Sequence, residues 1–471
     1  MNPRSFFNFL LGPIFVVILS FISIPLMTSL FPPETIGKFA ILQVLITFSI
    51  VFLSFGLDLS YIRSYHETME KKSLLFSSLL PGIGLLIVVI FICLLISPSF
   101  IASKLFEADN TLYFYISALA VLFSFLIRFF SLPLRMENKG KSFSLVQSIP
   151  KVFLFLFLLI AYNLNIIFDD FFWLLSAHCV SLFFALLINF IILGRSQFTF
   201  NLPYISISSY KKMLQFGVPA AFSGLIFWLF QSSDKLLLKT LAPLSDLGVY
   251  SVAFSISAGV AVFSNVFNML WSPYIFEKLS SNSKLDDLGY FIDFYLMFTY
   301  FFLGLAIACS PVITLFFSEQ YFSIQYIIAC CALGFLFYSL SEMTAIGINI
   351  EKKTSKGLIA TVISAIFGIL ISYFLVLYFS ATGAAIGMLI SYWIYLVLRT
   401  EVSIRVWKKV DRLKIYSVTL IALSFASTFA LLKLDEYKYT IVAVFIYYII
   451  GFLIFRKTFK QTIKFIIKLK N

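Results

Sequence analysis

The 471-residue chain has little charge: Asp, Glu, Lys and Arg make up 12% of it, whereas soluble proteins carry about a quarter. Hydrophobic residues make up 61%, and the mean hydropathy is +0.99. This composition excludes a soluble globular domain. The apolar runs are continuous rather than alternating, which also excludes a β-barrel. The sequence therefore predicts an all-α polytopic membrane protein.

Sequence motifs for hydrolytic or metal chemistry are missing as well. There is no GxxxxGK[ST] phosphate loop, no HExxH and no CxxC, and the five cysteines lie inside apolar segments. No connecting segment exceeds about 20 residues, so a soluble catalytic domain has no room. We therefore expect no catalytic residues, no metal site and no cofactor, and we expect that the protein is not an enzyme.

Apolar segments of membrane-spanning length recur along the whole chain, since about 20 apolar residues suffice to cross a bilayer as a helix. We expect about 14 transmembrane helices, at residues 9–31, 37–57, 74–97, 112–134, 144–163, 171–193, 213–238, 247–271, 290–316, 322–346, 357–379, 381–399, 413–432 and 438–455.

The basic residues support this topology. Of the 35 Lys and Arg residues, 28 fall on one side of the membrane when alternate loops are grouped, including a group from Arg135 to Lys151. Six fall on the other side, and Arg128 lies within a span. By the positive-inside rule, both termini are cytoplasmic. The net charge of +13 thus reflects topology, and no nucleic-acid partner is expected.

The chain contains an internal repeat. FPPETIGKF (31–39) matches APLSDLGVY (242–250) at an offset of 211 residues, and Glu137 and Lys139 match Glu351 and Lys353 at an offset of 214. We expect an N-lobe of six helices at 1–200, a C-lobe of six helices at 201–405, and two C-terminal helices with a basic tail at 406–471. Gly383 and Gly387 form a GxxxG pair, which predicts close helix packing.

Charged residues inside spans are the candidates for function. Arg128 either snorkels to the cytoplasmic interface or faces a cavity, where its planar guanidinium suits a phosphate. Lys235 and Lys239 share one helical face, with Asp234 beside them, and either snorkel or form a cationic cavity rim.

Further polar residues within or near the spans also carry alternatives. Glu342 either carries a proton during transport or packs against a neighbouring helix, and Asp234 is the second candidate for ion coupling. Asp58 and Arg63 are expected to form a structural pair, with Arg63 a weaker cavity candidate. His178 is expected to make a contact between helices rather than to relay protons.

Several stretches resemble one known group. FGVPAAFSGLIFWLFQSSDKLLL, LSDLGVYSVAFSISAGV, FPPETIGKFAILQ, FGLDLSYIRSYHE and TGAAIGMLISYWIYLVLR look like segments of Wzx-type polysaccharide flippases. These belong to the multidrug/oligosaccharidyl-lipid/polysaccharide exporter superfamily. The resemblance implies two six-helix lobes in a V-shaped, MATE-like arrangement.

The resemblance also implies a function. Such proteins move an oligosaccharide repeat unit linked to undecaprenyl diphosphate (O-antigen or a similar surface polysaccharide) from the cytoplasmic to the outer leaflet of the bacterial inner membrane. Membrane lipids, a polysaccharide polymerase and a chain-length regulator are the implied partners. Two alternatives stay open: a cation-coupled multidrug exporter of the same fold, and a membrane-embedded polymerase or ligase of lipid-linked glycans. The first helix contains no acid and the outer loops are short, which disfavours both.

Overall fold

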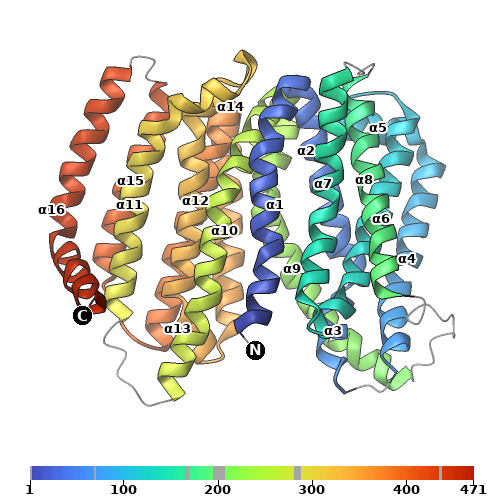
Figure 1. Cartoon of the computed structure of the whole chain (residues 1–471), viewed down its shortest axis with the longest axis horizontal. Helices are drawn as coiled ribbons and strands as arrows, with labels where there is room; N and C mark the ends of the chain where they lie inside the picture. The colour runs from blue at the N-terminus through green and yellow to red at the C-terminus, as the bar shows by residue number, and fades with distance from the viewer. Residues whose placement is uncertain are drawn as a thin grey trace. The chain divides into compact units, whose positions relative to one another are not determined.

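The computed structural model describes residues 3–67, 70–164, 169–194, 207–280, 288–433 and 437–470. Within these segments the chain is helical and contains no strand (Figure 1). It forms two compact units, Met1–Ser232 and Ser233–Asn471, which are described separately below.

The first unit consists of long helices interrupted by two short ones. In chain order they are α1 (Pro3–Leu30), α2 (Pro33–Ser54), α3 (Leu57–Ser64), α4 (Lys71–Ile96), α5 (Pro98–Phe106), α6 (Thr111–Met136), α7 (Gly140–Leu164), α8 (Asp170–Leu193) and the first part of α9 (Ile207–Leu241). Helix α7 packs against α1 and α8, and α6 packs against α2 and α8.

The second unit contains the rest of α9 and the C-terminal helices. These are α10 (Leu244–Ser280), α11 (Leu288–Ile313), the 3₁₀ turns η2 (Thr314–Phe316) and η3 (Glu319–Tyr321), α12 (Ile324–Thr344), α13 (Ile346–Ile350), α14 (Thr354–Val406), α15 (Arg412–Leu432) and α16 (Tyr437–Lys470). Helix α12 lies at the centre, in contact with α10, α11, α14 and α15.

Local chemistry sets several helix starts. Helix α2 begins with Pro33, whose fixed φ suits the first helical turn and whose missing N–H needs no partner there. Asn110, Asp169 and Asp411 lie at the starts of α6, α8 and α15, and each side chain accepts a hydrogen bond from a backbone N–H of the first turn.

Twelve helices in the described segments are long and apolar enough to cross a membrane. One of them, α14, is two helices folded back on each other at Ser380 (φ 46°, ψ −123°). A Cβ added to Gly383 would lie 1.9 Å from the Leu375 carbonyl oxygen, and one added to Gly387 would lie 2.4 Å from Ser372 Oγ. Residues 15 apart in a straight helix are about 22 Å apart, so the two halves pack as a hairpin. The close packing predicted for this GxxxG pair is confirmed.

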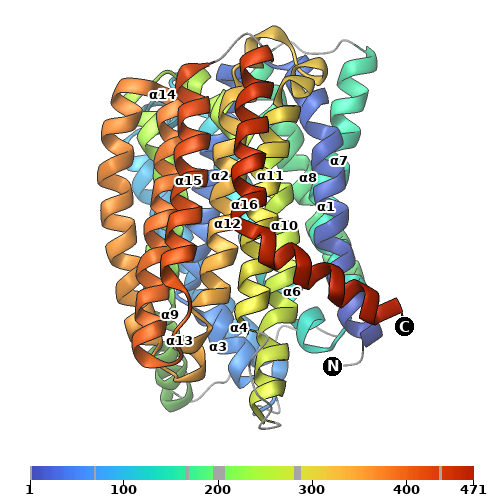
Figure 2. The same cartoon turned by 90° about the vertical axis from the view of Figure 1, so that its left-hand side faces the viewer.

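Counting the halves of α14 separately, and adding the apolar stretch Ile14–Leu30 of α1, gives the fourteen segments predicted from the sequence. The chain is thus a multi-pass α-helical membrane protein. Figure 2 shows one departure from a simple span: α16 changes direction, and its C-terminal part runs at an angle to the neighbouring helices.

Helices α2 and α3 meet at a sharp joint. Phe55 (φ 48°) and Gly56 (φ 68°) both adopt the left-handed conformation, which turns α3 away from α2. A Cβ on Gly56 would lie 2.1 Å from the Gly217 carbonyl oxygen of α9, so the two backbones touch directly. Ser60 Oγ also donates a hydrogen bond to the Met213 carbonyl (2.8 Å). Only glycine fits at position 56, because it tolerates positive φ and has no Cβ to clash with the Gly217 carbonyl.

The internal repeat is visible in the backbone. In the turn after α6, Asn138 has φ 57° and Lys139 N–H donates to the Leu134 carbonyl (2.9 Å). In the turn after α13, 214 positions later, Lys352 has φ 54° and Lys353 N–H donates to the Ile348 carbonyl (2.9 Å). The two turns that the predicted repeat aligns thus have the same backbone conformation, one in each unit.

Candidate functional site: polar groups within the helical units

A polar cluster lies inside the first unit, contributed by three spanning helices. His178 of α8 is buried, and its Nε2 is 3.1 Å from Gln43 Nε2 of α2. The ring also makes an edge contact with Phe39 (5.2 Å between centroids). The contact between helices that was predicted for His178 is confirmed. Its Nδ1 is buried and has no hydrogen-bond partner among the described residues.

Lys151 of α7 is grouped with this cluster because α7 packs against α8, the helix that carries His178. Lys151 lies near the middle of a helix of spanning length. Its grouping with the cytoplasmic loop residues is wrong, because α7 begins at Gly140 and carries Lys151 into the span. One turn earlier on the same face lies Gln147, which is exposed. In the described part of the chain, no ion pair involves Lys151.

Arg128 of α6 is paired with an acid. Its Nη2 and Nε donate to Asp58 Oδ2 at 2.8 and 3.3 Å. The Arg128 side chain is 39% exposed and that of Asp58 9%, so the pair lies at the edge of the helix packing. The pairing of Asp58 with Arg63 expected from the sequence is wrong. The joint at Gly56 redirects α3, and Asp58 thereby meets α6.

Arg63 is exposed near the end of α3. Its guanidinium carbon lies 4.6 Å from the ring centroid of Phe216 on α9, within the range of a cation–π interaction. Arg63 and Arg128 therefore contact different partners within the first unit.

The second unit holds the Asp234 cluster. Asp234 is 4% exposed and accepts hydrogen bonds from the Tyr250 hydroxyl of α10 and from the Lys235 amide (2.9 Å). The Lys235 ammonium lies 3.8 Å from the ring centroid of Phe254. Lys239, one turn later on α9, is half-buried. The sequence prediction that Lys235 and Lys239 share a face near Asp234 agrees with the continuous helix over these positions.

Glu342 of α12 belongs to a separate cluster of the second unit. Arg399 of α14 donates to Glu342 and to the Tyr395 hydroxyl, and the ring of Tyr395 stacks with that of Tyr338 (5.9 Å between centroids). The Arg399 side chain is only 11% exposed. Glu342, whose side chain is 26% exposed, thus joins two helices through an ion pair with a largely buried arginine.

Comparison with known proteins assigns the chain to a family. Residues 4–278, more than half of the chain, match the family described as "Polysaccharide biosynthesis protein". The chain is a member of the polysaccharide biosynthesis protein family. Comparison with curated protein sequences finds no significant match.

Solved structures with a similar fold are transporters. The lipid II flippase MurJ in an inward closed conformation aligns with a TM-score of 0.69, at 17% identity over 95% of this chain and 99% of that chain. A MATE family multidrug transporter of the MOP superfamily, in its inward-facing conformation, gives 0.60 at 16% identity over 85% and 95%. The Vibrio cholerae MATE transporter VcmN in its bent form gives 0.54 at 14% identity over 90% and 98%.

At these identities the likeness establishes the fold alone. With the family match, it confirms the resemblance to polysaccharide flippases of this superfamily that the sequence motifs indicate.

Several members of these clusters were missed from the sequence. Lys151 was grouped with loop residues, Arg399 was not named as a candidate, and Tyr250 carries no motif. The signal for Lys151 was its place inside the predicted span 144–163. Partners such as Tyr250 cannot be deduced, because they depend on how α9 and α10 pack.

Proposed function

We propose that this protein flips an oligosaccharide repeat unit linked to undecaprenyl diphosphate, for O-antigen or a similar surface polysaccharide, from the cytoplasmic to the outer leaflet of the bacterial inner membrane. Membership of a polysaccharide biosynthesis family and the fold of transporters support this proposal together. The few charged residues within the spanning helices suit the movement of a polar headgroup through the bilayer rather than its chemical transformation.

The observation that carries the proposal is the Lys151 cluster. A lysine near the middle of a membrane span is costly unless it serves a polar ligand or a water-filled cavity. Gln147 and Gln43 add uncharged hydrogen-bonding groups, which suit sugar hydroxyls and phosphate oxygens. A diphosphate that leaves water needs such partners, because an unpaired buried charge is strongly disfavoured. We propose Lys151 as a contact of the diphosphate.

The other candidate cations take different parts in this proposal. Lys235 and Lys239 contact the anionic headgroup toward the outer end of α9, where the Phe254 ring holds Lys235 without neutralising it. Arg128 contributes less to binding because its guanidinium already forms an ion pair with Asp58. Arg63 lies where a headgroup would enter from the cytoplasmic side.

Ion coupling is assigned to Asp234 rather than to Glu342. The Asp234 carboxylate is buried and is held by the neutral Tyr250 hydroxyl and a backbone amide, so it can exchange a proton or cation without breaking an ion pair. Glu342 is paired with Arg399, so protonation of Glu342 would break an ion pair. We also propose that both termini lie in the cytoplasm. A polysaccharide polymerase and a chain-length regulator are the proposed partners.

The test uses a deletion strain of the source bacterium that carries the wild-type gene, Lys151→Gln or Lys141→Gln. Lys141 is exposed near the start of the same helix and serves as the matched control. We expect Lys151→Gln to lower surface polysaccharide about tenfold or more, because a charge-assisted contact to phosphate is lost. In the deletion strain, a membrane-impermeant reagent added to spheroplasts should leave the lipid-linked repeat units unmodified until the membrane is permeabilised, because they remain on the cytoplasmic face.

Two results would overturn the proposal. Repeat units that reach the outer leaflet but stay unpolymerised in the deletion strain would indicate a polymerase or ligase. Unchanged polysaccharide with altered drug sensitivity would indicate a multidrug exporter. The absence of an acid from α1 weighs against the exporter.

A further inference from the structure

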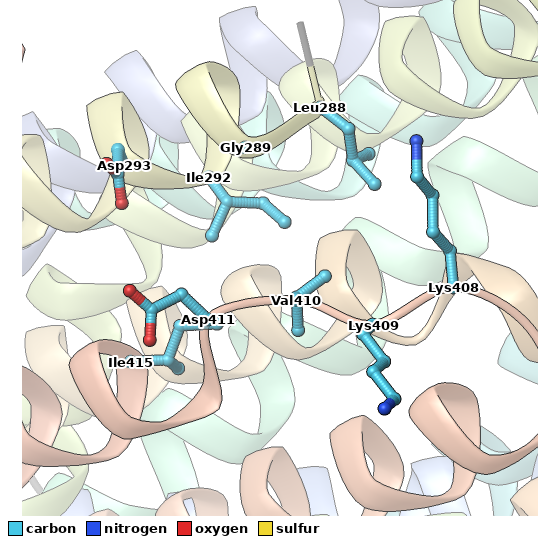
Figure 3. Close-up of a pocket in the computed structure, with 9 residues that line it drawn as sticks. All are labelled: Leu288, Gly289, Ile292, Asp293, Lys408, Lys409, Val410, Asp411 and Ile415. Carbon is cyan, nitrogen blue, oxygen red and sulfur yellow. The ribbon is translucent and has the colours of Figure 1, made fainter. Parts of the chain in front are cut away.

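A pocket of about 360 Å³ lies at one end of the second unit, apart from the clusters described above. It is bordered by the start of α11 and by the segment that joins α14 to α15 (Figure 3). Its floor is apolar, formed by Leu288, Ile292, Val410 and Ile415.

The two ends of this pocket carry opposite charges. Figure 3 shows Asp293 and Asp411 together at one end, and Lys408 at the other beside Leu288, with Ile292 and Val410 between them. The Lys409 side chain points away from α11. The pocket is therefore dipolar, with an apolar surface between its charged ends.

The acidic end retains hydrogen-bonding capacity. Lys414 Nζ donates to Asp293 Oδ2 (2.5 Å), which neutralises that carboxylate. Asp411 Oδ1 accepts a bond from the Lys414 amide (3.3 Å) as the N-cap of α15. A carboxylate has about four acceptor positions, so Asp411 can accept further bonds from a cationic group.

The pocket lies at the boundary of the spanning segments. Candidate spans begin at Leu288, end at Val406 and begin again at Arg412. The pocket is lined by Leu288 and by residues 408–411, which lie between the last two of these positions. Leu413 is 75% exposed, so lipid-facing side chains begin at this level. The basic residues of this end place it on the cytoplasmic side by the positive-inside rule. Phospholipid headgroups lie at this depth.

We infer that this pocket binds the headgroup of a cytoplasmic-leaflet phospholipid bearing a primary amine, a phosphoethanolamine diester. The phosphate lies at Lys408 and the ammonium at Asp411, while the glycerol and first methylenes cover Ile292 and Val410. A purely anionic headgroup would leave Asp411 without a cation. A quaternary ammonium would have no N–H to donate to it.

The experiment measures lipids retained by the full-length protein in detergent, by native mass spectrometry. The probes are phosphatidylethanolamine, phosphatidylcholine and phosphatidylglycerol with identical acyl chains. The variants are Asp411→Asn, Lys408→Gln and Lys409→Gln. Asn caps helices as well as Asp does, so Asp411→Asn removes the charge and keeps the N-cap.

For the wild type we expect phosphatidylethanolamine to be retained about tenfold better than the other two lipids, the effect of one charge-assisted hydrogen bond. Asp411→Asn should abolish this preference without weakening phosphatidylglycerol. Lys408→Gln should weaken all three lipids, whereas Lys409→Gln should resemble the wild type.

Equal retention of the three lipids by the wild type, or a preference that survives Asp411→Asn, would overturn the assignment. Competition by soluble glycerophosphoethanolamine at the same concentration as the lipid would show a site for a free solute, and would overturn the lipid identity.

Discussion

The two units share the backbone conformation of one turn, and they differ in the charged residues near that turn. Arg128 of α6 and Glu342 of α12 lie 214 positions apart, the offset at which the turns that follow these helices have the same backbone conformation. The first is a cation paired with Asp58, and the second is an anion paired with Arg399. Matching positions in the two units thus both form an ion pair, but the residue is a cation in the first unit and an anion in the second.

The difference extends to Lys151. The position 214 residues later is Ala365, which is 5% exposed and lies in the first half of α14. Asp234 and Glu342 of the second unit have hydrogen-bond or ion-pair partners in the same unit, whereas Lys151 of the first unit lies outside any ion pair of the described residues. The two units therefore share the conformation of these turns and differ in the polar groups at the matching positions.

Ala365→Lys, which puts a lysine at the position of the second unit that matches Lys151, should have the largest effect. It would place an ammonium where alanine is buried, and the free-energy cost of an unpaired buried charge exceeds the typical free energy of unfolding of a domain. We expect little or no monodisperse protein on size-exclusion chromatography in detergent. Ala365→Met, which adds similar volume without charge, is the control and should give clearly more protein. Equal yields of the two variants would contradict the contrast.

Glu342→Gln is the next largest effect. It removes the negative charge beside the Arg399 guanidinium and leaves only neutral acceptors, the Gln carbonyl oxygen and the Tyr395 hydroxyl, so we expect a loss of about 2–4 kcal/mol of stability. Unfolding of the purified protein in detergent would measure it. The double variant Glu342→Gln, Arg399→Met should recover most of the loss, because no buried charge then remains. A double variant no better than the single one would show that the charge is not the cause.

Arg128→Gln should cost less, about 1–2 kcal/mol, because the Arg128 side chain is 39% exposed and water can partly replace it beside Asp58. The same unfolding measurement applies, with Arg63→Gln as the control for loss of a nearby exposed charge. A loss equal to that of Glu342→Gln would remove the distinction between an edge pair and a buried pair.

Ser380→Gly should have the smallest effect, and a favourable one. Ser380 adopts φ 46°, a conformation that glycine reaches without cost, so relief of this strain should stabilise the hairpin of α14 by about 1 kcal/mol. A small upward shift of the unfolding midpoint would agree with this. A downward shift would mean that the Ser380 side chain supports the hairpin.

Sequence reasoning predicted the spans well because apolar length and loop charge are properties of the chain itself. It found the break at residue 380 between two spans, and it found the turns around Glu137 and Glu351. It placed Arg128 inside a span but missed Asp58 as its partner, because the joint at Phe55–Gly56 depends on contact with α9. Partners that come from other helices, such as Tyr250 for Asp234, are set by packing that no spacing encodes.

The Gly56–Gly217 contact has one more consequence. Where two helices meet through side chains, interlocking shapes fix their rotation as well as their distance. Here two backbones touch at Gly56 and Gly217, while the Ser60–Met213 hydrogen bond and the Arg63–Phe216 contact cross the same junction. Rotation of α9 about its own axis would break both contacts. The close approach therefore sets the distance between α9 and the α2–α3 joint, and the two side-chain contacts set the rotational position of α9.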